Sequence, residues 1–141
     1  QYLWDQTLRM VWLGEAYLHA GRLDEAETQA QHALEFSRTH QERSHETYAL
    51  WLLGESAAHR ELPESEKAEA YYRQALALAD ELGMRPLQAH CHLGLGTLYA
   101  TTGQREPART ALGAAIALYR AMGVRFWLPQ VGTTLAQVEG R

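Results

Sequence analysis

Two Glu-x-x-x-His pairs, Glu15/His19 and Glu55/His59, are the side chains of this sequence best suited to chemistry. On a helix, residues four positions apart share one face, so each pair would present a carboxylate beside an imidazole. Such pairs could attract a cationic side chain, with the histidines adding pH sensitivity. The alternative is a solvent-exposed helix face, where each pair contributes only about 0.2–0.5 kcal/mol to stability.

The run His90-Cys91-His92 is a second group of potential metal ligands. Residues two positions apart on a helix point about 200° from each other, so the two imidazoles cannot both reach an ion held by Cys91. The sequence also has no Gly-rich phosphate loop and no motif for nucleophilic catalysis. We therefore expect no catalytic residue, no metal site, no cofactor and no enzyme activity. A metal or catalytic site on the two Glu/His pairs is the alternative.

A repeated pattern of helices must position these side chains. Each of three copies has Leu-Gly on a first helix and two alanines, seven positions apart, on a second helix. The copies are Leu13-Gly14 with Ala26 and Ala33, Leu53-Gly54 with Ala68 and Ala75, and Leu95-Gly96 with Ala108 and Ala115. We expect the glycine to face the alanines, so that both backbones approach closely, near the short end of the usual range of about 8–10 Å. The pattern predicts an all-α solenoid.

The expected domain organisation is a single domain over residues 1–141. Helices are expected at roughly 3–20, 23–39, 44–60, 65–82, 86–102, 106–122 and 125–139. Repeat 1 would cover about 3–40, repeat 2 about 44–83, repeat 3 about 86–123, and a capping helix about 125–139. Gly21, Gly83, Gly103 and Gly123 are expected to end helices in the left-handed conformation. Phe126 and Trp127 are expected in the core, where they would seal the capping helix.

The Leu-Gly-x-x-Tyr…Ala pattern resembles the tetratricopeptide repeat. Equivalent glycines lie 40 and 42 residues apart, which is similar to the long-period tetratricopeptide arrays of bacterial regulators and kinesin light chains. The resemblance implies a right-handed α-solenoid of three helix pairs plus the capping helix. It also implies that the first helices line a concave groove for a peptide or protein. The repeat register places in this groove Val11, Glu15, Leu18, His19, Tyr48, Trp51, Glu55, His59, His90, Leu93, Thr97, Thr101 and Gln130.

About the last sixty residues carry a narrower resemblance, through Gly-Met-Arg-Pro, His-Cys-His-Leu-Gly-Leu-Gly and Arg-Phe-Trp-Leu. They are similar to the C-terminal repeat region of bacterial proteins that join a class III adenylate/guanylate cyclase domain, an AAA-type ATPase domain and tetratricopeptide repeats. This resemblance implies that the chain is a fragment of a larger bacterial signalling protein and serves as its regulatory arm. Any catalytic domain would lie outside the fragment.

Composition limits the possible partners. The net charge of −4 disfavours nucleic acid, which requires a basic face. No apolar stretch approaches the roughly 18 residues of a membrane span, and the lone Cys91 is typical of a reducing cytoplasm. We expect a protein or peptide ligand, with self-association as the alternative. The first forty residues carry six acids against three bases, and residues 101–141 carry five bases against two acids. Weak association through the N-terminal face would bury Trp4.

Overall fold

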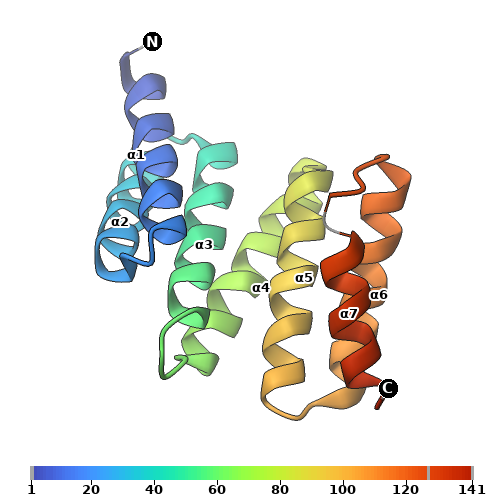
Figure 1. Ribbon diagram of the computed structural model, residues 1–141. Helices are drawn as coiled ribbons and strands as arrows, with labels where there is room; N and C mark the ends of the chain where they lie inside the picture. The colour runs from blue at the N-terminus through green and yellow to red at the C-terminus, as the bar shows by residue number, and fades with distance from the viewer. Residues whose placement is uncertain (1, 127, 141) are drawn as a thin grey trace.

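The computed structural model is a row of antiparallel helices joined by short turns (Figure 1). It describes residues 2–126 and 128–140, and only the backbone of residues 2–5. The described helices are α1 (Tyr2–His19), α2 (Leu23–Thr39), α3 (Arg43–Ala58), α4 (Ser65–Leu82), α5 (Arg85–Thr101), α6 (Arg105–Ala121) and α7 (Leu128–Val138). The described residues contain no strand, and the expected all-α helical repeat fold is confirmed.

The helices form two layers. Within the first layer, α1, α3, α5 and α7 contact one another in that order, and each of α2, α4 and α6 packs against the first-layer helices on either side of it. Figure 1 shows the first-layer helices lying side by side across the molecule. This arrangement follows from the repeated Leu-Gly and Ala pattern, because each helix pair buries one face within the pair and another against the next pair.

Tyr72 on α4 occupies the close contact that the glycines create. A methyl group added at Gly54 on α3 would lie 2.8 Å from the Tyr72 ring, and one added at Gly94 on α5 would lie 2.5 Å from it. Gly96 meets Leu112 on α6 in the same way, at 2.6 Å. The side chains that lie against Gly54 and Gly96 thus come from one helical turn after the first alanine of each pair. At Gly14 an added methyl group would instead meet Leu52 of α3, with the main-chain oxygen of Ala26 3.6 Å away.

The turns after the helices have the expected left-handed glycines. Gly83, for example, has φ of 68° where α4 ends, and Gly21, Gly103 and Gly123 also have positive φ. After α2 the corresponding turn contains Gln41, with φ of 56°. A left-handed conformation is unfavourable for a residue with a Cβ atom, so this turn is strained relative to the others.

The last helix differs from the expectation. It begins at Leu128, three residues later than expected, so Phe126 lies in the preceding turn and is 81% exposed. The prediction that Phe126 seals the core is therefore wrong. Val131 is fully buried in its place, and Leu135 packs beside it on the cluster formed by α5 and α6. Trp127 and the side chain of Trp4 lie outside the described residues.

Candidate functional site

A hollow of about 450 Å³ lies between the helices of the first layer. It is contributed by α1, α3, α5 and α7, by the loop after α3, and by one side chain of α4. Its lining consists of Leu18, His19, Trp51, Glu55, Ala58, His59, Pro63, Tyr72, His90, Leu93, Gly94, Thr97, Leu98, Thr101 and Gln130.

Most of the residues that the repeat register placed in a groove line this hollow. They are Leu18, His19, Trp51, Glu55, His59, His90, Leu93, Thr97, Thr101 and Gln130. Glu15 and Tyr48 are partly exposed and lie outside the lining. Val11 is only 3% exposed and packs in the core against residues of α2 and α3, so its placement in the groove is corrected.

Beyond these ten residues, the lining also includes Ala58, Pro63, Tyr72, Gly94 and Leu98. The register assigns the groove to first helices only, whereas Tyr72 reaches it from α4, through the space left by Gly94. The glycine two positions before Gly96 was a signal for this space. Pro63 belongs to the two-residue insertion of the second repeat, which lengthens the loop beside the hollow.

Glu55 carries the negative charge of the hollow. Its carboxylate Oε2 accepts a hydrogen bond from the Tyr72 hydroxyl. Burial raises the pKa of the Glu55 carboxyl above its ordinary value, and the Tyr72 hydrogen bond and the nearby His59 and His19 partly offset that rise. Burial and the neighbouring Glu55 carboxylate likewise hold the pKa of the Tyr72 hydroxyl well above its ordinary value.

The two Glu/His pairs have different surroundings. His59 Nδ1 lies 2.8 Å from the main-chain oxygen of Glu55, a hydrogen bond to the backbone and not to the carboxylate. Helix α1 packs against α3, and the charges of Glu15 and His19 on α1 affect the pKa of Glu55 on α3. Burial also raises the pKa of Glu15, with His19 opposing it. Of these four side chains, only Glu55 combines a place in the lining with a partly buried hydrogen bond to another side chain.

An aromatic chain forms one wall of the hollow. The rings of Trp51 and His90 lie 5.7 Å apart, and His90 Nδ1 is 2.6 Å from the Tyr119 hydroxyl. Burial lowers the pKa of His90, so the neutral imidazole is favoured. The Trp51 indole nitrogen is buried and has no hydrogen-bond acceptor among the described residues. A buried N–H donor without an acceptor costs free energy.

The His90-Cys91-His92 run does not form a ligand cluster. Cys91 is fully buried, and burial raises its thiol pKa to about 12. His90 faces Tyr119, whereas the pKa of His92 responds to Asp80. In the described part of the chain, no three His, Cys, Asp or Glu side chains are grouped so that they could hold a metal ion.

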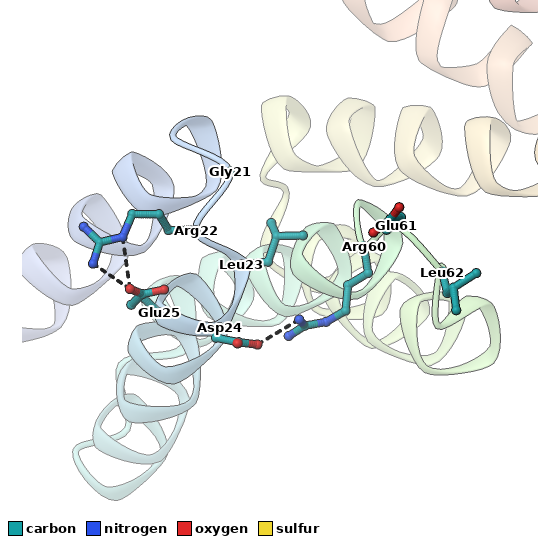
Figure 2. A pocket seen from close by; sticks show the side chains of 8 residues that line it. All are labelled: Gly21, Arg22, Leu23, Asp24, Glu25, Arg60, Glu61 and Leu62. Carbon is teal, nitrogen blue, oxygen red and sulfur yellow. Dashed lines mark hydrogen bonds and ion pairs between the residues drawn. The ribbon is translucent and has the colours of Figure 1, made fainter.

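A second hollow, of about 510 Å³, lies at the turns after α1 and α3 (Figure 2). Arg60 joins the two helix pairs there, because its guanidinium lies 2.8 Å from Asp24 and 2.7 Å from Glu27. Arg22 pairs with Glu25 at 2.6 Å. Since these charges satisfy one another, the second hollow is a contact between repeats, and the first offers more to a ligand.

Comparison with known proteins agrees with the helical pattern. The sequence model of the tetratricopeptide repeat family matches residues 6–81, which span α1 to α4 and more than half of the chain. No curated protein matches the chain. Among the described helices, none has the combination of length and apolar character that crossing a membrane requires.

Proposed function

The chain belongs to the tetratricopeptide repeat family, and we propose that its first-layer hollow binds a peptide segment of a protein partner. Repeats of this family generally mediate protein–protein interaction and are not catalytic. The expectation of a protein partner agrees with this general role. The place of binding and the identity of the partner are our proposal.

The observation that carries the proposal is the hollow at Trp51. Tryptophan is among the residues that most often contribute large binding energies at interfaces. Here it is partly exposed, and it lines the same concave surface as Leu93 and the polar residues Thr97 and Gln130. A peptide supplies both apolar side chains to cover such a wall and main-chain groups to hydrogen-bond with its polar residues.

The wider context is also proposed. The similarity of about the last sixty residues to cyclase–ATPase–tetratricopeptide proteins supports a regulatory arm of a larger bacterial signalling protein in the cytoplasm. In that case the gene should encode cyclase and ATPase domains in the same polypeptide. A complete reading frame that encodes neither would exclude this context and leave peptide binding unaffected.

Display of random peptides on phage tests the binding site. Peptides selected on the wild-type protein should fail to bind Trp51→Ala, because the variant loses the aromatic wall. They should also fail to bind Thr97→Arg, in which a longer side chain fills the hollow. Trp12→Ala is the matched control, since Trp12 is 61% exposed on α1 outside the lining. Circular dichroism would verify that each variant folds. Selected peptides that bind all three variants equally would contradict the proposed site.

Self-association is a second candidate function, favoured by the outer face of α1. Trp12 is 61% exposed and Leu13 is 43% exposed on neighbouring positions of that helix. Exposed apolar side chains that adjoin one another often mark a protein contact. A second copy of this chain could cover them, and the opposite charge of its two ends would favour a head-to-tail approach.

A further inference from the structure

Glu55 lacks a cationic partner in the hollow. No lysine or arginine is among the described residues of the lining. The carboxylate accepts one hydrogen bond, at Oε2 from Tyr72, and no ion pair of Glu55 is found within the described part of the chain. The imidazoles of His59 on α3 and His19 on α1 lower the pKa of Glu55 by their charge, and Glu15 raises it as a second negative charge.

The position of this carboxylate is determined by packing. The Tyr72 ring is held between Gly54 and Gly94, at distances that leave no room for a Cβ atom on either helix. Because Tyr72 is only 1% exposed, its hydroxyl keeps one direction, and the hydrogen bond orients the Glu55 carboxylate. A binding group that is already oriented does not lose side-chain entropy when the ligand arrives.

We propose that the hollow recognises a lysine side chain of the bound peptide, with the ammonium group on the Glu55 carboxylate and the methylene chain against Trp51. This inference rests on the proposed function and identifies the side chain of the peptide that the site binds. The lysine stem suits an apolar wall, because its four carbons can be buried while the ammonium stays polar. Trp51 can also attract the cation through the face of its ring.

Lysine fits the free part of the carboxylate better than arginine does. A guanidinium binds a carboxylate most strongly as a fork that uses both oxygens. At Glu55 the Tyr72 hydroxyl already takes one acceptor site of Oε2, and this hydrogen bond restricts the approach of a fork to both oxygens more than the approach of a single donor to Oε1. An ammonium is a point donor that needs one oxygen. A cation at Oε1 would also offset the burial that raises the pKa of Glu55.

Binding measurements with the selected peptides test the inference. Each peptide that requires Trp51 would be synthesised with its lysine retained, replaced by glutamine, or replaced by arginine. On the wild-type protein, replacement by glutamine should weaken binding about ten-fold or more, the scale of a charge-assisted hydrogen bond. Replacement by arginine should weaken binding by less.

The second part of the test changes the protein instead of the peptide, in the variant Glu55→Gln. It keeps an acceptor for Tyr72 and removes the charge, so it should bind the lysine peptide about as weakly as wild type binds the glutamine peptide. The glutamine peptide should bind both proteins equally. Glu35→Gln is the control, because Glu35 is an exposed acid on α2 outside the lining. It should bind like wild type.

The possible outcomes separate the two proposals. Peptides that need Trp51 but have no lysine requirement, and that bind Glu55→Gln as well as wild type, would overturn the lysine inference and leave peptide binding intact. Arginine peptides that bind more tightly than lysine peptides would overturn the choice of cation. If no selected peptide depends on either Trp51 or Thr97, the proposed site is wrong and the inference falls with it.

Discussion

The surroundings of Glu55 distinguish this carboxyl group from its counterpart in the first repeat. Glu15 and Glu55 occupy equivalent positions of consecutive repeats, and burial raises the pKa of both. Only Glu55 faces a tyrosine hydroxyl that can donate to it. The reason lies on α4, where Tyr72 stands one turn after Ala68, whereas the corresponding residue of the first repeat is Ala30.

The raised pKa of Glu55 makes a pH-dependent prediction about stability. The folded protein holds this proton more tightly than the unfolded chain, whose ordinary pKa is 4.5. The contribution of the protonated carboxyl to stability is therefore complete below that value and is lost as pH rises through the raised pKa. Glu55→Gln stays neutral at every pH, so it should escape this loss.

Thermal unfolding of both proteins measures the effect. The melting temperature of Glu55→Gln should be close to that of wild type near about pH 4 and higher than wild type near about pH 7.5. For Glu35→Gln, at an exposed position, we expect no such pH-dependent difference. If the difference in melting temperature between Glu55→Gln and wild type became smaller as the pH rises, this result would contradict the direction of the pKa shift.

At the scale of helices, the contact between α5 and α6 depends on the absence of a side chain at Gly96. An added Cβ atom would lie 2.6 Å from Leu112 Cγ, which is fully buried and has little room to move. Gly96→Ala should therefore destabilise the protein by about 1–3 kcal/mol through overpacking. Urea unfolding, monitored by circular dichroism, measures the change.

Gly113 on α6 is the matched control for this prediction. It is exposed, and a Cβ atom there would meet nothing within 4 Å. Because alanine favours a helix over glycine, Gly113→Ala should stabilise the protein by roughly 0.5–1 kcal/mol. The same change from glycine to alanine is thus expected to lower the stability of the protein at Gly96 and to raise it at Gly113. Equal effects at the two positions would show that Gly96 is not at a close helix contact.

At the scale of the whole molecule, the first helix has a face that its counterparts bury. The residue two positions before the repeat glycine is Leu52 in α3, with 0% exposure, and Gly94 in α5, also buried. In α1 the same position is Trp12, which is 61% exposed. In α3 and α5 this face packs against the preceding helix pair, and no described helix covers it in α1.

Self-association through this face makes a prediction for the isolated chain. Sedimentation at increasing protein concentration should show weak association of the wild type, and Trp12→Glu should abolish it by placing a charge in the contact. Leu62→Glu is the matched control, since Leu62 is 85% exposed in the loop after α3. It should associate like wild type. A wild-type protein that stays monomeric at high concentration would exclude this candidate.

The number, type and order of the helices could be predicted from sequence, because they depend on local patterns. Leu-Gly and paired alanines recur in register, and left-handed glycines mark helix ends at positions such as Gly83 and Gly103. Each of these signals acts within one or two helical turns. The turn at Gln41 gave no such signal, since the chain there adopts a left-handed conformation without a glycine.

The composition of the hollow depended on tertiary packing. A repeat register states which helix face is concave, but not which side chain from another layer reaches through to it. Tyr72 enters because Gly54 and Gly94 leave space on both sides of its ring, a contact between three successive helices that no single helical turn contains. Phe126 is exposed and Val131 is buried against α5 and α6, a difference that depends on tertiary packing and not on local periodicity. Local periodicity contains no information about which residues of different helices come into contact, so only the packed structure determines these contacts.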